Sequence, residues 1–258
     1  MIERNDRLET SYSQLNMYLQ CPYRWHLKYQ KGIRFDHKVK HLEYGLAVHE
    51  AYEKFFIDKP EMGELVDFFK NNAKKREIPF DSPVEEMEFM MEAEIAFNAL
   101  YDPQSEIEKL MVESEIVGIE EDFEYELNGV TILGFIDLIV RDDMGLVCID
   151  HKSGKPIKPD KLKTDWQFPI YAMAIKEKYG EYPYAFYYNY PRFHDFKRVV
   201  IPENRIELTK EEIKKTFKKM DRKSHTAKPT PLCYWCDFGK YHGGQCKASS
   251  DWKPKEAK

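Results

Sequence analysis

Hydrophobic and polar positions alternate along the middle of the chain, in three consecutive stretches at residues 116–127, 130–140 and 145–153. Many of the apolar residues in these stretches are β-branched or aromatic. A period of two places successive side chains on opposite faces of a strand. Asn128–Gly129 and the segment 141–145 separate the stretches, and both are good hairpin turns. The pattern therefore predicts a three-stranded meander.

Apolar side chains return every three or four residues on the N-terminal side of this meander, which predicts helices. The first predicted helix begins at Ser11 and is ended or redirected at Pro22. Its apolar face consists of Leu15, Tyr18 and Leu19. A second stripe, within residues 44–56, consists of Ala47, Val48, Ala51, Tyr52 and Phe55.

The remaining segments complete an α/β pattern. Residues 60–110 are mostly helical by periodicity, with an interruption at Pro79–Pro83, and we interpret them as a helical insertion. Residues 165–180 predict a further helix, and residues 182–191 and 196–202 predict two more strands. Helices on both sides of a strand-rich centre indicate an α/β fold.

Composition limits the class of protein. The 258 residues are 42% apolar, which suffices for one substantial domain with an appended lobe. No apolar run approaches the roughly 20 residues of a membrane span, and the charged N-terminus does not resemble a signal peptide, so we expect a cytoplasmic protein. The net charge of −5 combines acidic residues 85–126 with a basic segment at 209–228, which we interpret as a solvated helix face.

Two acids and a lysine occur at the ends of the predicted hairpin strands. Asp137 and Asp150 are at similar distances from the turn at 142–145, so they should lie close together across the strand pair, whose strands are about 5 Å apart. A divalent cation would relieve their repulsion, and Lys152 would point to the same side as Asp150. Alternatively, the acids are polar strand ends and Lys152 is a solvent lysine; this spacing alone does not decide.

The surrounding motifs do decide. "GFID" with "IDHKSG" resembles the G-x-x-D … D-x-K-[ST]-G signature of the PD-(D/E)XK nuclease superfamily, in particular its RecB-like branch. "GLAVHE", "QFPIY" and "SYSQLNMYLQCPYRW" resemble three further motifs of that branch, in the expected order. Ile136 stands where other branches have proline, and His151 stands where an apolar residue is commoner. His151 could add a metal ligand or face the other side of its strand, and we favour the second.

The resemblance implies a restriction-endonuclease-like core, at residues 112–205 of a single domain spanning 1–258, and hydrolysis of DNA with Mg²⁺ or Mn²⁺. The implied metal ligands are His49, Asp137, Asp150 and the backbone carbonyl of His151. Lys152 would orient or deprotonate the attacking water, and Gln167 and Tyr171 would position Lys152 or the scissile strand. Without the motifs, His49 would be a half-buried helix residue, and Gln167 and Tyr171 a packing pair. Glu120 and Glu121 are more easily interpreted as solvent-facing carboxylates, so we leave both outside the core set.

Four of the five cysteines form a second pattern. Cys233 and Cys236 make a C-x-x-C, Cys246 follows, and Cys21 lies near the N-terminus. Thiolates with this spacing suit either Zn²⁺ or an iron–sulfur cluster. The family resemblance favours a [4Fe–4S] cluster in a lobe formed by residues 10–30 and 229–250, with structural Zn²⁺ as the alternative. Cys148 lies in a predicted strand and should be an ordinary core residue.

Two functions of different classes follow. The first is a DNA exonuclease acting on ends or single strands in recombination, repair, phage DNA metabolism or CRISPR spacer processing, with a helicase, recombinase or integrase as a possible partner. The second is a catalytically silent DNA-binding or adaptor subunit that keeps the fold and the cluster. Silent relatives usually lose an acid or the lysine, whereas this chain keeps the whole set, which favours the nuclease.

Overall fold

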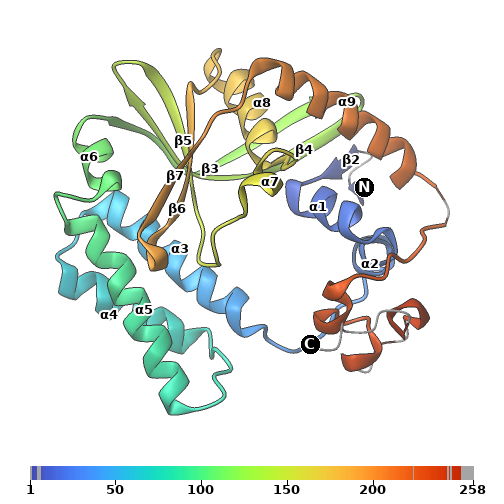
Figure 1. Cartoon of the computed structure of the whole chain (residues 1–258), viewed down its shortest axis with the longest axis horizontal. Helices are drawn as coiled ribbons and strands as arrows, with labels where there is room; N and C mark the ends of the chain where they lie inside the picture. The colour runs from blue at the N-terminus through green and yellow to red at the C-terminus, as the bar shows by residue number, and fades with distance from the viewer. Residues whose placement is uncertain (1, 5–6, 223, 243, 245, 251–258) are drawn as a thin grey trace. The chain divides into compact units, whose positions relative to one another are not determined.

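The computed structural model describes residues 2–4, 7–222, 224–242, 244 and 246–250 (Figure 1). Contacts within the chain divide it into two compact units. The terminal unit comprises Met1–Asp36, Glu124–Gly134 and Glu207–Lys258. The central unit comprises His37–Phe123 and Phe135–Ile206. No helix among the described residues has the length and apolarity required to cross a bilayer.

The central unit contains a mixed sheet. Its strands are β3 (Glu115–Leu127), β4 (Val130–Asp142), β5 (Gly145–His151), β6 (Ala185–Tyr190) and β7 (Asp195–Val199), and the ends of β3 and β4 that meet at their turn belong to the terminal unit. β4 pairs with β3 and runs antiparallel to β5, β5 runs parallel to β6, and β6 runs antiparallel to β7. The predicted meander and the α/β class are confirmed.

Local sequence explains both hairpin turns of the meander. Asn128 and Gly129 adopt φ values of 56° and 74°, the left-handed conformation that a two-residue hairpin turn requires and that these residue types tolerate best. At the next turn, the Asp142 side chain accepts hydrogen bonds from the backbone N–H groups of Met144 (2.8 Å) and Gly145 (3.2 Å). The second turn sets the register in which Leu138 pairs with Ile149.

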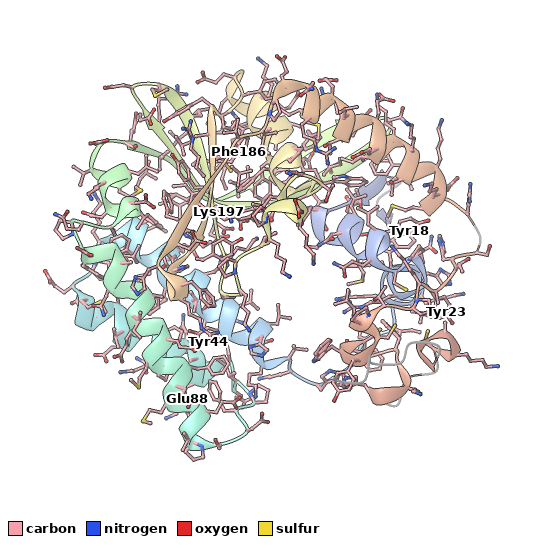
Figure 2. All side chains as sticks on the ribbon, viewed as in Figure 1. Tyr18, Tyr23, Tyr44, Glu88, Phe186 and Lys197 are labelled. Atoms are coloured by element: carbon pink, nitrogen blue, oxygen red, sulfur yellow. The ribbon has the colours of Figure 1, made fainter. Side chains whose placement is uncertain are left out.

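Helices cover both faces of this sheet. One face packs against α3 (Lys40–Asp58), α4 (Met62–Lys75), α5 (Pro83–Tyr101) and α6 (Glu106–Val112). Residues 60–110 are thus mostly helical, as their periodicity predicted. The ring centre of Tyr44 of α3, labelled in Figure 2, lies 4.7 Å from that of Phe89 of α5 in this layer. The other face packs against α8 (Gln167–Tyr179), which follows the short helix α7 (Pro159–Leu162). The ring centre of Phe168 of α8 lies 5.0 Å from that of Phe186 and 4.4 Å from that of Tyr188, both in β6.

The terminal unit is built from short elements. β1 (Ile2–Arg4) pairs with β2 (Arg7–Thr10), which runs parallel to the start of β4. α1 (Tyr12–Gln20), α2 (Pro22–Trp25) and a π-helical turn (His26–Gln30) follow, and α9 (Glu203–Met220) belongs to this unit from Glu207 onward. Three 3₁₀ turns complete it, at Pro231–Trp235, Lys240–His242 and Lys247–Ser250.

The first helix largely follows its sequence signals. Ser11 caps α1 by accepting a hydrogen bond from the Gln14 backbone N–H, and Pro22 redirects the chain into the first turn of α2. Leu15 and Tyr18 are buried as predicted. The prediction for Leu19 is wrong, because this side chain remains 42% exposed at the end of a helix only nine residues long.

Candidate metal and catalytic centre

The two acids of the hairpin lie side by side, as the strand register requires. Leu138 pairs with Ile149, so Asp137 and Asp150 are opposite one another one step further along the strands. The backbone N–H of His151 donates a hydrogen bond of 2.6 Å to Asp137 Oδ2. Asp150 is 2% exposed, so its charge requires partners within the protein. The hairpin itself therefore creates an acidic site at the strand ends.

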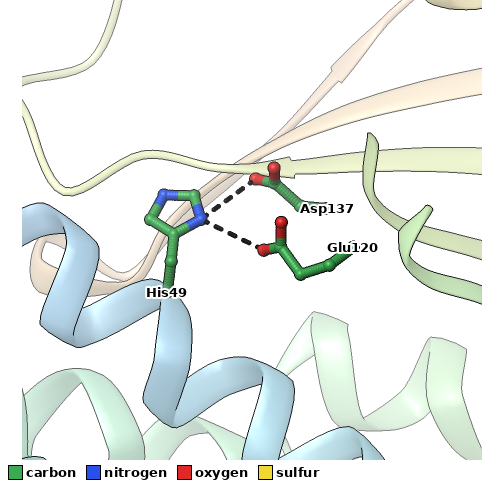
Figure 3. A group of neighbouring side chains, drawn as sticks. All are labelled: His49, Glu120 and Asp137. Atoms are coloured by element: carbon green, nitrogen blue, oxygen red, sulfur yellow. Dashed lines mark ion pairs between the residues drawn. The ribbon is translucent and has the colours of Figure 1, made fainter. Parts of the chain in front are cut away.

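Three side chains from three elements, His49, Glu120 and Asp137, lie together, with the His49 ring within reach of both carboxylates (Figure 3). His49 of α3 places its Nδ1 3.6 Å from Asp137 Oδ2 and 3.6 Å from Glu120 Oε1 of β3. The candidate ligand atoms of His49, Glu120 and Asp137 all lie within 4.8 Å of one another. Two carboxylates and an imidazole are a suitable ligand set for Mg²⁺ or Mn²⁺, with the nitrogen favouring Mn²⁺.

Close packing of α3 brings His49 to the sheet. Gly45, one turn before His49 in the "GLAVHE" motif, faces the segment that follows β5. A Cβ atom at Gly45 would lie 3.0 Å from the Ser153 side-chain oxygen, closer than ordinary contacts allow. Glycine at this position therefore permits the approach of the helix that carries the imidazole.

Asp150 lies beside this triad and is held by a separate set of contacts. Its Oδ2 lies 2.5 Å from Lys152 Nζ. Its Oδ1 accepts a 2.6 Å hydrogen bond from Gln167 Nε2 and a longer one, 3.4 Å, from the Tyr171 hydroxyl. Tyr188 donates to Gln167 Oε1 (3.3 Å), which fixes the orientation of the amide. Gln167 and Tyr171 thus contact Asp150, the ion-pair partner of Lys152. Their predicted role in positioning Lys152 or the scissile strand stays a prediction.

The His151 imidazole lies on the α3 side of the sheet. Its ring stacks on Tyr52 and Phe56, with ring centres 4.4 Å and 5.7 Å apart. Its Nδ1 lies 2.9 Å from the Asn189 amide nitrogen. Burial lowers the pKa of His151, and His49 and Lys152 lower it further, so the ring is neutral. The ring thus acts as a core side chain at the end of β5, and the backbone N–H of His151 contacts Asp137.

The electrostatics of the triad favour a bound cation. Burial raises the pKa of Asp137 to about 7, and Asp150 raises it too, against the opposing effects of His49 and Lys152. Burial alone would lower the pKa of His49, but Glu120, Asp137 and Asp150 together raise it to about 9. Without an ion the triad therefore retains protons near neutral pH, and a dication would displace them.

Glu120 is the residue that the sequence interpretation missed. Its backbone has φ of 44°, in the left-handed region that strand residues rarely adopt. This conformation interrupts the alternation of β3, so the period of two could not tell which of the two adjacent glutamates faces the site. Glu121 turns elsewhere and forms an ion pair with Lys178. Two features of the sequence pointed to an irregular strand here: the adjacent pair Glu120–Glu121 and the internal glycine Gly118.

The four cysteines of the predicted cluster line one cavity of the terminal unit, and Leu232 and Phe238 are among its apolar neighbours. The backbone N–H of Lys228 points to Cys21 Sγ at 3.5 Å, and that of Thr230 to Cys233 Sγ at 3.4 Å. Burial raises the pKa of Cys236, and the neighbouring Cys21 and Cys233 raise it further. Among the described residues, no three thiols have sulfur atoms within 4.8 Å of one another. Cys148 is a fully buried core residue, as predicted.

Comparison with known proteins identifies the family. The model of the PD-(D/E)XK nuclease superfamily matches residues 9–241, a span that holds every candidate residue except Cys246. The crystal structure of a "putative exonuclease" from Eubacterium rectale has the same fold, with a TM-score of 0.54 and 16% sequence identity, over 92% of this chain and 89% of that one. No curated protein matches the sequence. The chain belongs to the PD-(D/E)XK nuclease superfamily.

Proposed function

We propose that the protein is a metal-dependent nuclease that hydrolyses DNA phosphodiester bonds, acting as an exonuclease on DNA ends. The observation that supports this proposal most strongly is the juxtaposition of two groups of side chains. His49, Glu120 and Asp137 form a ligand set for a hard dication, and the ion pair of Asp150 and Lys152 lies next to it. An ion-binding set beside a fixed ammonium group is suited to binding and polarising a phosphodiester.

The side chains have separable roles in this chemistry. His49, Glu120 and Asp137 would hold Mg²⁺ or Mn²⁺, which when bound supplies a Lewis acid and lowers the pKa of water. Burial acts to lower the pKa of Lys152, but Asp150 and Asp137 together raise it. Lys152 is therefore a permanent cation that stabilises charge developing on the phosphate. Gln167 and Tyr171 fix Asp150, and through it the position of the Lys152 ammonium.

The charge distribution of the central unit supports a localised DNA contact. This unit contains 21 Lys and Arg against 32 Asp and Glu, a formal charge of −11, so most of its surface repels a polyanion. Residues 152–163, here called the lysine loop, contain five lysines and one acid. Its four lysines after Lys152 are all exposed: Lys155, Lys158, Lys161 and Lys163. The lysine loop begins at Lys152 of the proposed centre, so its exposed lysines can bind DNA phosphates next to the bond that is cleaved.

A second part of the proposal concerns the terminal unit, where we assign a [4Fe–4S] cluster to Cys21, Cys233, Cys236 and Cys246. All four line one cavity, and backbone N–H groups point to two of the sulfurs. One tetrahedral zinc ion would draw four sulfurs to within about 4 Å of one another, since each bond is about 2.3 Å long. Structural zinc is the alternative, and the iron, sulfide and zinc contents of the purified protein distinguish the two.

The cluster is tested by anaerobic purification of the whole protein. We expect a brown protein with visible absorbance and with iron and sulfide in equal amounts. The Cys21→Ala variant should lose the colour and melt at a lower temperature, because it removes the N-terminal ligand that would join α1 to the C-terminal cysteines. Colourless protein with stoichiometric zinc would contradict the assignment.

The nuclease is tested by digesting end-labelled linear, circular and single-stranded DNA in Mg²⁺ or Mn²⁺. Wild-type protein should shorten linear DNA, and Asp150→Ala and Lys152→Ala should not. The alternative is a silent adaptor of a helicase, recombinase or integrase complex, which would bind DNA without cleaving it under any of these conditions. Equal digestion by wild type and both variants would show that the centre lies elsewhere.

A further inference from the structure

An exposed aromatic ring lies next to the proposed centre. Phe135 of β4 is 59% exposed, the largest value among the described aromatic side chains of the central unit. The intervening residue, Ile136, is 1% exposed and points to the opposite face of the strand. Alternation along β4 therefore places Phe135 on the same face as Asp137, about 7 Å away along the strand.

A single exposed apolar side chain is ordinary on a protein surface, so exposure alone carries no conclusion. The position of Phe135 is what distinguishes it. Along the same face of β4, Asp137 lies in the metal triad and Ile139 is fully buried. Phe193, the other exposed phenylalanine of this unit, is 37% exposed and lies in the 3₁₀ turn Pro191–Phe193 between β6 and β7. Phe135 thus combines an accessible ring with a fixed place beside a ligand of the ion.

The Phe135 ring and the proposed ion site lie on one face of β4, two residues apart, so a nucleotide whose phosphate binds at the ion would have its base within reach of the ring. Every nucleobase has a flat face that can stack on an aromatic ring, whatever its sequence. A base inside a duplex already stacks on its neighbours and would have to leave the helix to meet such a ring. The lysine loop can hold the backbone of either kind of DNA, but Phe135 can stack only on an unpaired base.

We propose that Phe135 is a base-stacking residue that holds an unpaired nucleobase beside the scissile phosphate, which makes single-stranded DNA the substrate class. This inference rests on the proposed nuclease function. It assigns the selection of single strands to one side chain of β4, and the metal triad only to cleavage.

The test measures binding separately from cleavage. In an Asp150→Asn background with Ca²⁺, fluorescence anisotropy gives the Kd for a single-stranded 12-mer and for a blunt hairpin duplex. Phe135→Ala should weaken single-strand binding by about 5- to 150-fold and change duplex binding less than twofold. Phe135→Trp should retain the affinity, and Phe135→Leu, which keeps apolar bulk without a π face, should behave like Phe135→Ala. Phe193→Ala is the matched control and should bind like the parent.

A set of 12-mers with one abasic site, moved along the strand, locates the stacked base. At one position the abasic strand should bind the parent and Phe135→Ala equally, because the ring has no base to hold. Equal binding of the intact 12-mer by the parent and Phe135→Ala would overturn the inference. A defect that persists undiminished at every abasic position would also overturn it, since it would reflect a change in structure. Failure of wild-type protein to cleave DNA would contradict the nuclease while leaving these binding results intact.

Discussion

Replacement of Gln167 by leucine tests whether the support of Asp150 matters for the centre. Gln167 is 5% exposed, and its Nε2 donates a 2.6 Å hydrogen bond to a carboxylate that is 2% exposed. Leucine has nearly the same volume, so the change removes the donor without opening a large cavity. After the change, Asp150 Oδ1 would retain only the 3.4 Å contact with the Tyr171 hydroxyl.

The expected magnitudes follow from the loss of one charge-assisted hydrogen bond. Such a bond contributes about 1.5–3 kcal/mol, and an unsatisfied buried acceptor adds to the loss. In a chain of this size each kcal/mol lowers Tm by about 2–4 °C, so Gln167→Leu should melt several degrees below wild type. Because Asp150 in turn fixes Lys152, we expect the rate of DNA cleavage to fall by about 10- to 100-fold.

Two further variants make the experiment specific. Gln167→Glu places a second carboxylate against Asp150, and only its protonated form can donate as glutamine does. Its loss of stability should therefore be smaller at pH 5 than at pH 8, whereas the loss in Gln167→Leu should not depend on pH in this way. Gln104→Leu, an exposed position, is the control and should change neither Tm nor rate. A Gln167→Leu protein that cleaves DNA within twofold of wild type would refute the role assigned to this amide.

Three other predictions concern charge. Asp137 and His49 have pKa values of about 7 and about 9, so the apparent affinity for Mn²⁺ should rise from pH 6 to pH 9. Calorimetry in two buffers should detect the proton release, and a pH-independent affinity would contradict this. The pKa of Asp137 lies above its unfolded value near 4, so its ionisation destabilises the ion-free protein as pH rises from 4 to 7. Ion-free Asp137→Asn should therefore melt above wild type at pH 8, with the difference in Tm closing by pH 5, although this variant binds Mn²⁺ poorly. Replacing the four exposed lysines of the lysine loop by glutamine should reduce the slope of log Kd against log salt for single-stranded DNA by up to about 3, and an unchanged slope would place the phosphate contacts elsewhere.

Local signals explain why the sequence was sufficient for most of the fold. The period of two over residues 116–153 and the Asn128–Gly129 turn act between near neighbours, so they define the meander without knowledge of the rest of the chain. The position of Asp137 opposite Asp150 then follows from the register alone. Pro169 also behaves as expected, because it lies in the first turn of α8, where its missing N–H group has no helical partner to lose.

The features that escaped prediction depend on side-chain directions between distant segments. The contact of Gln167 and Tyr171 with Asp150 depends on how α8 rotates against β5, and helix periodicity specifies only that the two side chains share a face. The membership of Glu120 in the triad depends on one residue with an unusual φ, which no hydrophobic pattern encodes.

The left-handed backbone at Glu120 has a consequence for engineering this enzyme. A side chain other than glycine or asparagine in that conformation costs about 1–2 kcal/mol, so the folded chain tolerates an unfavourable residue at this position. A variant library sorted only for heat resistance should therefore accumulate glycine or asparagine at residue 120, and those clones should cease to cut DNA. Selection for robustness and selection for catalysis would thus diverge at a single position of β3.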